Sequence, residues 1–255
     1  VIAAAKNLKV IGRMGVGVDN IDLKEAQAHQ ISVVNAAVAT TQAVAELTLG
    51  FMFALVREIP RADASMKAGQ WLKKEFNGAE LFGKTLGIVG FGNIGSTVGK
   101  YAQALGMNVL AFDPFRDQAN IIAQGAECVS FDELLSRSDV ISIHAPYKEQ
   151  NHHFISDEAF AKMKDGVFLV DAARGGLVDE EALLRALENG KVRGAALDVY
   201  EKEPPINWDL VKHPKVIATP HIGAQTKEAQ CRAAVDISTE VLNALNGKPL
   251  RWKIC

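Results

Sequence analysis

The sequence predicts an α/β protein built around a doubly wound parallel sheet. Between residues 81 and 221, short apolar runs alternate with amphipathic segments, which is typical of repeated strand-helix units. A glycine-rich turn, GFGNIG, joins one apolar run to the amphipathic segment that follows it. With 255 residues, 48% of them hydrophobic, the chain can bury the core of one large domain or two modest ones.

Each strand of the expected sheet is a short apolar run: residues 85–89, 108–113, 127–128, 140–144, 167–171, 194–198 and 216–219. The helices expected between them are residues 93–105, 132–136, 157–162 and 179–189. The last has clear signals at both ends, because Asp179 can cap its free N–H groups and Gly190 can end it. Its leucines at 183, 184 and 187 recur at helical spacing.

Further elements flank this block on both sides. Residues 8–12 and 31–35 are expected to form two strands around a short helix at 23–28, followed by a long helix at 40–57. After the block, residues 227–245 have the spacing of another long helix, which could return to the N-terminal part. No internal repeat or low-complexity segment is evident.

Composition excludes several classes of function. Lys and Arg total 28 against 30 for Asp and Glu, so there is no basic excess for a nucleic-acid partner. The three cysteines are widely separated and lack metal-ligand spacing, so we expect a reducing, cytoplasmic environment and no metal site. No signal peptide and no apolar run long enough to cross a membrane is found.

The glycine turn is the strongest indication of a ligand. Gly90 allows a tight turn, Gly92 lets the backbone approach a pyrophosphate, and Gly95 permits close packing of helix on strand. The diphosphate would lie at the helix N-terminus, and Asp113, at the end of the next strand, could bind the adenosine ribose. This order predicts a Rossmann-type domain that binds NAD rather than NADP, although the nearby Arg116 weakens the distinction. A strand-helix turn without a ligand is the alternative.

Three polar residues follow later strands, at the sheet edge where ligands of parallel sheets bind. Arg174 can hold a substrate carboxylate, His221 can exchange a proton with a carbonyl oxygen, and Glu203 can stabilise the imidazolium. Taken singly, each is more simply explained as a loop or structural residue. Together, at one edge of a nucleotide-binding sheet, they favour carbonyl reduction.

These residues lie within motifs that resemble the D-isomer-specific 2-hydroxyacid dehydrogenases. The likeness runs from Leu8 to about Pro249 and includes GRMGVGVDN at 12–20, AVAE at 43–46, GKTLGIVGFG at 83–92, ARGG at 173–176, GAALDV at 194–199, EPP at 203–205 and PHIGA at 220–224. The motifs stand in the order that the family shows. The resemblance therefore implies an NAD-dependent oxidoreductase acting on a D-2-hydroxy acid.

The resemblance also implies roles for individual residues. The catalytic set is Arg174, Glu203 and His221, with Glu203 preferred to Glu201 because it immediately precedes the proline pair. Substrate contacts are implied at Arg13, Val16 and Gly17. Cofactor contacts are implied at Gly90, Gly92, Asn93, Ile94, Gly95, Asp113, Ala145, Pro146, Ala172, Ala173, Asp198, Gly223 and Ala224.

Several positions depart from the family pattern. Asn93 stands where Arg is frequent, which removes a positive charge from the diphosphate turn, and Asp171 stands where Asn is common. Ala145 occupies a position where a hydroxyl residue can occur. His152 and His153 replace part of a loop that is often Thr-rich, and we interpret both as surface or packing residues rather than chemical groups.

The resemblance implies two domains. Residues 37–223 would form the NAD-binding Rossmann domain, residues 1–36 a remnant of a smaller flavodoxin-like substrate domain, and residues 224–255 the helix that returns to it. Relatives usually have further residues before this point, on the order of 50 for a two-layer domain, so the substrate domain is expected to be incomplete here. A homodimer through the NAD-binding domain is also implied, and the apolar helix at 40–57 is a candidate contact.

The predicted reaction is hydride transfer between NAD(H) and C2 of a small 2-hydroxy or 2-keto acid. Phosphohydroxypyruvate, the keto form of 3-phosphoglycerate, is favoured, and glyoxylate or hydroxypyruvate is the alternative. A non-enzymatic NAD(H)-sensing scaffold of the corepressor type remains open, because such relatives can keep the three catalytic residues. A methyltransferase is disfavoured by Gly95 and by the later Arg, Glu and His.

Overall fold

The computed structural model describes residues 1–255, which divide into two compact units. One unit comprises Val1–Val44 and Gly223–Cys255, and the other comprises Ala45–Ile222. Within the chain, no helix combines the length and hydrophobicity that crossing a membrane requires.

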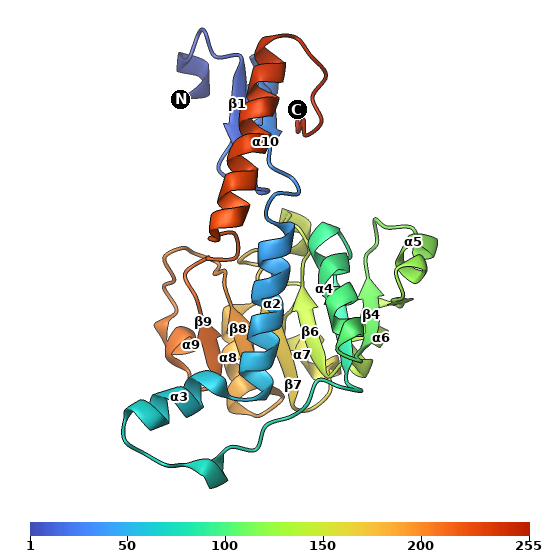
Figure 1. Cartoon of the computed structure of the whole chain (residues 1–255), viewed down its shortest axis with the longest axis vertical. Helices are drawn as coiled ribbons and strands as arrows, with labels where there is room; N and C mark the ends of the chain where they lie inside the picture. The colour runs from blue at the N-terminus through green and yellow to red at the C-terminus, as the bar shows by residue number, and fades with distance from the viewer. The chain divides into compact units, whose positions relative to one another are not determined.

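The larger unit contains a seven-stranded, wholly parallel sheet in the order β5-β4-β3-β6-β7-β8-β9 (Figure 1). Its strands are β3 (Thr85–Val89), β4 (Asn108–Phe112), β5 (Glu127–Cys128), β6 (Val140–Ile143), β7 (Val167–Asp171), β8 (Val192–Leu197) and β9 (Val216–Ala218). The chain passes from β3 outward to β4 and β5, then returns to the other side of β3 for β6 to β9. This reversal confirms the doubly wound α/β class.

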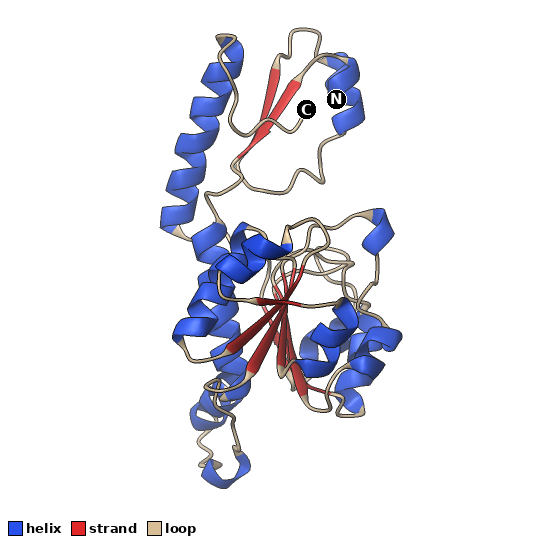
Figure 2. Cartoon of the chain, turned by 90° about the vertical axis from the view of Figure 1, so that its right-hand side faces the viewer, coloured by secondary structure: helices blue, strands red, loops and turns tan.

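The helices of this unit are α2 (Thr41–Val56), most of which lies in it, α3 (Ile59–Lys67), α4 (Asn93–Ala104), α5 (Gln118–Ala123), α6 (Phe131–Arg137), α7 (Asp157–Lys162), α8 (Glu180–Glu188) and α9 (Trp208–Lys212). Short 3-10 turns occur at Lys73–Glu75 and Glu149–Asn151. Helices lie on both sides of the twisted sheet (Figure 2).

Two consecutive residues of β3 show how both faces are covered. Gly87 faces α6, because a Cβ added at Gly87 would lie 2.8 Å from Leu134 of that helix. Ile88 faces α4, because its side chain lies 3.1 Å from the position of a Cβ added at Gly95 of that helix. Because successive strand residues point to opposite faces, α6 and α4 cover opposite faces of the sheet. The central strands are consequently buried on both sides, as the fully buried Ile141 and Leu169 show.

Local capping explains where two of the helices begin. Ser130 and Glu133 form a reciprocal capping box at the start of α6. The Asp179 carboxylate accepts hydrogen bonds from the N–H groups of Glu181 and Ala182, each at 3.0 Å, at the start of α8. Gly190, with φ 83°, follows the end of α8, so both predicted signals of this helix are confirmed.

The smaller unit is a two-stranded parallel sheet with helices. Its strands are β1 (Val10–Arg13) and β2 (Ser32–Asn35), joined through α1 (Leu23–Ala28), and it also holds the 3-10 turn Ile2–Ala4 and the long helix α10 (Lys227–Leu245). A Cβ added at Gly12 would meet Val241 at 2.8 Å and Ile237 at 3.0 Å, so α10 packs directly on β1. Within this unit, segments from the two ends of the chain therefore share one core.

The observed elements match the sequence-based expectations to within two residues at most ends. Three helices were not predicted: α3, α5 and α9. Asp117 and Asn207 cap α5 and α9 by accepting backbone hydrogen bonds, and these signals could have revealed both helices. One strand end differs in a way that concerns the site, because β4 ends at Phe112 and Asp113 lies beyond it.

Candidate active site

Polar and glycine residues of the larger unit collect where the parallel strands end. Gly90 follows β3, Asp113 follows β4, and Ala145 comes shortly after β6. On the far side of the sheet, Arg174 comes after β7, Glu203 after β8 and His221 after β9. The predicted cofactor residues thus flank the reversal of strand order beside β3, and the predicted catalytic residues occupy the three neighbouring strand ends.

The three glycines of the turn differ in what surrounds them. Gly90 has φ 90°, and a Cβ there would lie 2.7 Å from the backbone nitrogen of Ala145. A Cβ at Gly95 would overlap the carbonyl oxygen of Gly90, so only glycine lets α4 approach the strand end this closely. At Gly92 a Cβ would meet no protein atom within 4 Å. The protein therefore requires glycine at 90 and 95, while the space at Gly92 is open to a ligand.

The N-terminus of α4 is suited to an anion. No side chain caps it at Gly92, and its first turn contains no acidic residue. The N–H groups of a first helical turn lack partners within the helix and, with the helix dipole, favour negative charge. The open space at Gly92 and the uncapped amides that follow it, at Asn93 and Ile94, therefore fit the diphosphate of a dinucleotide.

Asp113 is held in place beside this turn. One carboxylate oxygen accepts a hydrogen bond from the N–H of Phe91 at 2.8 Å, and the other accepts one from the N–H of Phe115 at 2.9 Å. Both bonds fix the orientation of the carboxylate at the end of β4. A carboxylate in this position can accept further hydrogen bonds from ribose hydroxyls, because each oxygen has a second lone pair.

His221 and Glu203 form a pair at the end of β9. The Nδ1 of His221 lies 2.7 Å from Glu203 Oε2, and since a carboxylate only accepts, Nδ1–H is the donor. Glu203 Oε1 accepts a second hydrogen bond, from the N–H of Tyr200 at 3.3 Å. The side chains are 48% and 39% exposed, so Nε2 of His221 can reach a substrate. His221 also has φ 54°, a strained backbone of the kind found at functional sites.

Asp198 holds the loop that carries His221 through hydrogen bonds. This buried carboxylate accepts hydrogen bonds from the Thr219 hydroxyl at 2.6 Å and from the N–H of Ile222 at 2.7 Å. The Tyr200 hydroxyl donates to the carbonyl oxygen of Thr219 at 3.1 Å. Sequence reasoning did not identify Thr219 or Tyr200. Asp198 and these two residues hold the His221 loop in one position.

Arg174 is half-buried and lies on a loop organised by Asp171. The Asp171 carboxylate accepts hydrogen bonds from the backbone N–H groups of Ala173, at 2.9 Å, and Arg174. Burial raises the pKa of Asp171 to about 7, despite these hydrogen bonds and the nearby guanidinium. A Cβ at Gly175 would overlap the carbonyl oxygen of Tyr200, so the Arg174 loop packs against the loop that carries Glu203.

His144 is a second ionisable group with a shifted pKa at this edge; its side chain is half-buried, and sequence reasoning did not single it out. Its Nε2 forms a hydrogen bond with the Ser142 hydroxyl at 2.9 Å, and its Nδ1 is buried without a hydrogen-bond partner. Burial lowers the pKa of His144 to about 3, so the ring is neutral near pH 7.

The remaining predicted residues belong to the smaller unit. Arg13, at the end of β1, donates from Nε to the carbonyl oxygen of Gly17 at 3.2 Å. The carbonyl oxygen of Val16 accepts from the Asn35 amide at 2.7 Å. These contacts gather Arg13, Val16 and Gly17 in a single loop. Gly223 and Ala224 precede α10 in the same unit.

Comparison with known proteins decides the family. A model of the D-isomer specific 2-hydroxyacid dehydrogenase NAD binding domain matches residues 49–223. The chain belongs to the D-isomer specific 2-hydroxyacid dehydrogenase family. The resemblance recognised from its motifs is thus confirmed, as is the assignment of an NAD-binding domain.

Relatives within the dehydrogenase family carry several names. The chain is 48% identical to D-3-phosphoglycerate dehydrogenase of Bacillus subtilis, with 96% of this chain and 46% of the relative aligned. It is 47% identical to hydroxypyruvate reductase of Thermotoga maritima, over 96% of this chain and 80% of the relative. The chain spans about half the length of the phosphoglycerate dehydrogenases it matches, such as the Archaeoglobus fulgidus protein, of which it covers 48%.

Solved structures of dehydrogenases confirm the fold. A glyoxylate reductase from Paecilomyes thermophila superposes with a TM-score of 0.92 at 37% identity, covering 98% of this chain and 76% of the other. A D-lactate dehydrogenase from Aquifex aeolicus, complexed with NAD and lactic acid, gives a TM-score of 0.87 at 35% identity, with coverage of 94% and 77%.

Proposed function

We propose that the chain transfers hydride between NAD(H) and C2 of a D-2-hydroxy acid. The observation that carries this proposal is the His221–Glu203 pair, 2.7 Å apart, on a loop next to that of Arg174 and at the sheet edge that bears the glycine turn. An oriented acid-base pair at the same sheet edge as an open dinucleotide turn is what carbonyl reduction requires.

The proposed cofactor site follows the strand ends. Gly90, Gly92, Asn93, Ile94 and Gly95 would hold the diphosphate, and Asp113 the adenosine ribose. The nicotinamide half would contact the backbone and side chains at Ala145, Pro146, Ala172, Ala173 and Asp198. The family resemblance adds Gly223 and Ala224 to the proposed cofactor set. When bound, NADH supplies the hydride that reduces a keto group.

In the proposed mechanism, His221 donates a proton from Nε2 to the carbonyl oxygen of the 2-keto acid, because its Nδ1 is bonded to Glu203. Glu203 stabilises the imidazolium and is itself oriented by the N–H of Tyr200. Arg174 binds the substrate carboxylate through its guanidinium and polarises the carbonyl. In the direction of oxidation, His221 accepts the hydroxyl proton instead.

Phosphohydroxypyruvate is the proposed keto acid, with Arg13, Val16 and Gly17 contributing to its binding. The phosphoglycerate dehydrogenases at 48% to 50% identity support this choice. Hydroxypyruvate is a second candidate, since the chain covers 80% of a hydroxypyruvate reductase at 47% identity. A panel of 2-keto acids, scored by kcat/KM for NADH oxidation, ranks the two.

The role of His221 is tested by substitution. In His221→Ala we expect kcat to fall about 100- to 10,000-fold while the Kd for NADH changes less than about twofold. His29→Ala is the matched control, because His29 also pairs with a glutamate, Glu25 at 3.0 Å, but it is the C-cap of α1 in the smaller unit and belongs to no proposed catalytic or cofactor set. Equal losses of turnover and NADH affinity in His221→Ala contradict the assignment. Saturable NADH binding without turnover of any keto acid favours the sensing scaffold.

The domain roles, the assembly and the location are further parts of the proposal. Residues 37–223 bind NAD, and residues 1–36 and 224–255 contribute to the substrate domain. A homodimer forms through the NAD-binding unit, where α2 leaves Phe53 40% exposed, and light scattering would report its mass. Three free cysteines support a cytoplasmic location.

A further inference from the structure

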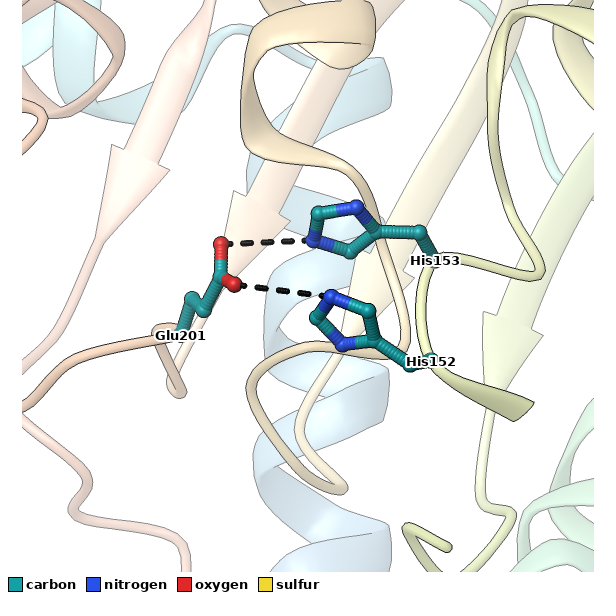
Figure 3. Close-up of side chains that lie close together, drawn as sticks. All are labelled: His152, His153 and Glu201. Atoms are coloured by element: carbon teal, nitrogen blue, oxygen red, sulfur yellow. Dashed lines mark ion pairs between the residues drawn. The ribbon is translucent and has the colours of Figure 1, made fainter. Parts of the chain in front are cut away.

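Two histidines and a glutamate from distant parts of the sequence meet beside the proposed active site. His152 and His153 follow the 3-10 turn Glu149–Asn151, and Glu201 lies on the loop after β8. All three point toward one another, with each imidazole directed at a different oxygen of Glu201 (Figure 3). Their potential ligand atoms lie within 4.8 Å of one another. We propose that His152, His153 and Glu201 bind a divalent transition-metal ion of the zinc type.

The distances between these groups suit a shared ion better than direct hydrogen bonds. Glu201 Oε2 lies 3.3 Å from His153 Nε2, and Oε1 lies 3.8 Å from His152 Nε2. Hydrogen bonds from nitrogen to oxygen are usually about 2.7 to 3.2 Å long. Zinc bonds of about 2.0 to 2.2 Å at tetrahedral angles place neighbouring ligand atoms about 3.4 Å apart. A tetrahedral site therefore requires the two imidazoles, whose rings stack with centroids 3.7 Å apart and an interplanar angle of 23°, to turn until both Nε2 atoms point at one ion.

The imidazoles present the correct nitrogen. His152 Nδ1 lies 3.3 Å from the Tyr147 hydroxyl, and His153 Nδ1 lies 3.9 Å from Asp179 Oδ2. The Tyr147 hydroxyl oxygen can accept from Nδ1–H of His152, which leaves the Nε2 lone pair of that ring for a cation. The 3.9 Å separation at His153 Nδ1 is too long for a hydrogen bond and fixes no tautomer there. His153 Nε2 is buried and makes no hydrogen bond. The Nε2 atoms of both rings thus face the Glu201 carboxylate.

The backbone beneath the ligands is fixed. The N–H of His153 donates to the carbonyl oxygen of Gly176 at 2.8 Å, and the N–H of Glu201 donates to Glu180 Oε1 at 2.8 Å. The imidazole rings stack with centroids 3.7 Å apart, and His153 has φ 52°, a left-handed conformation that non-glycine residues rarely adopt. The backbone that carries the three side chains is therefore held by neighbouring loops rather than being a free segment.

The chemistry of the donors selects the ion. Two imidazole nitrogens and one carboxylate oxygen match zinc, nickel or copper, whereas magnesium and calcium prefer oxygen alone. Three protein ligands leave a fourth position for water. Besides Glu201, Asp179 and Glu180 place carboxylates next to the histidines, which favours a cation. The sequence predicted no metal site, because nothing local connects residues 152 and 153 with residue 201.

Zinc binding to the full chain, measured by competition with a chromophoric chelator, tests the proposal without cofactor or substrate. We expect one saturable equivalent of Zn²⁺ and no competition from Mg²⁺. His152→Ala, His153→Asn and Glu201→Gln should each weaken binding at least about tenfold. Asn is chosen at position 153 because it tolerates the left-handed backbone. His29→Ala is the control and should bind zinc as the wild type does.

A second measurement keeps the result independent of folding defects in the variants. X-ray absorption at the zinc edge of the loaded wild-type protein should show two imidazole ligands at about 2.0 Å. Absence of saturable binding, wild-type affinity in His152→Ala and Glu201→Gln, or a spectrum without imidazole ligands would overturn the proposal. None of these outcomes depends on whether the protein oxidises NADH.

Discussion

Replacing Asp171 with Asn should change how stability depends on pH. The Asp171 carboxylate is 2% exposed, and burial raises its pKa from 3.8 to about 7. The folded protein therefore holds a proton that the unfolded chain releases. The contribution of the bound proton to the free energy of unfolding is fully present below the ordinary pKa of 3.8 and is lost as pH rises through about 7. The asparagine side chain of the Asp171→Asn variant keeps an oxygen to accept from the backbone N–H groups of Ala173 and Arg174 but cannot ionise.

The magnitude follows from the pKa of Asp171. A shift from 3.8 to about 7 corresponds to about 4 kcal/mol in total, at about 1.36 kcal/mol per unit. About 2 kcal/mol of this falls between about pH 5.5 and about pH 8.5. The free energy of unfolding of Asp171→Asn, relative to wild type, should therefore increase by about 2 kcal/mol across that interval.

Urea denaturation at a series of pH values measures this difference. Asp165→Asn is the control, because its side chain is 91% exposed and forms an ion pair with Lys191 at 2.8 Å. Its free energy of unfolding, relative to wild type, should not vary with pH. If the curves of Asp171→Asn and wild type run parallel, the reasoning from burial is refuted and Asp171 ionises as an ordinary carboxyl group.

The other predictions concern the glycine turn at residues 90–95, His144 and the N-terminal cap of α6. Gly92→Ala should weaken NADH binding at least about tenfold yet alter stability by less than about 1 kcal/mol, since the added Cβ meets no protein atom. Gly95→Ala, which overpacks the strand-helix contact, should lower the free energy of unfolding by about 1 to 3 kcal/mol. Calorimetry of NADH binding measures the effect expected for Gly92→Ala, and urea titration measures the effect expected for Gly95→Ala. The pKa of His144 falls from 6.5 to about 3. The contribution of the neutral ring to the free energy of unfolding is therefore present above pH 6.5 and is lost at about 1.4 kcal/mol per pH unit as the pH decreases below that value. His144→Gln should remove this acid sensitivity in urea titrations. Ser130→Ala should cost about 1 kcal/mol by removing the capping box of α6, seen as a lower Tm, and an unchanged Tm would contradict that role.

The pattern of strands and helices was readable from sequence wherever the signal is local. The alternation of apolar runs predicted all seven strands of the sheet, and Asp179 with Gly190 marked both ends of α8. The elements that were not predicted are short or begin unusually. α5 and α9 have six and five residues, which is too few for periodicity to show, and α3 has a proline in its first turn.

Within the candidate site, the sequence named the residues but not their partners. The sequence named Glu203 after its strand, and the family resemblance implied Glu203 rather than Glu201 because it immediately precedes the proline pair. In the fold, Glu203 lies beside His221, whereas Glu201 faces His152 and His153. A separation of two residues on a loop was enough to direct the two carboxylates to different clusters.

By itself, the sequence determined the doubly wound sheet, the glycine turn at its reversal point and the family, because these depend on periodicity, backbone sterics and motif order along the chain. Tertiary structure alone decided the shifted pKa values of Asp171 and His144 and the meeting of Glu201 with the two histidines. Ionisation depends on what surrounds a group in space, and a ligand cluster depends on which loops the sheet brings to the same edge. Neither is encoded in the residues adjacent along the chain.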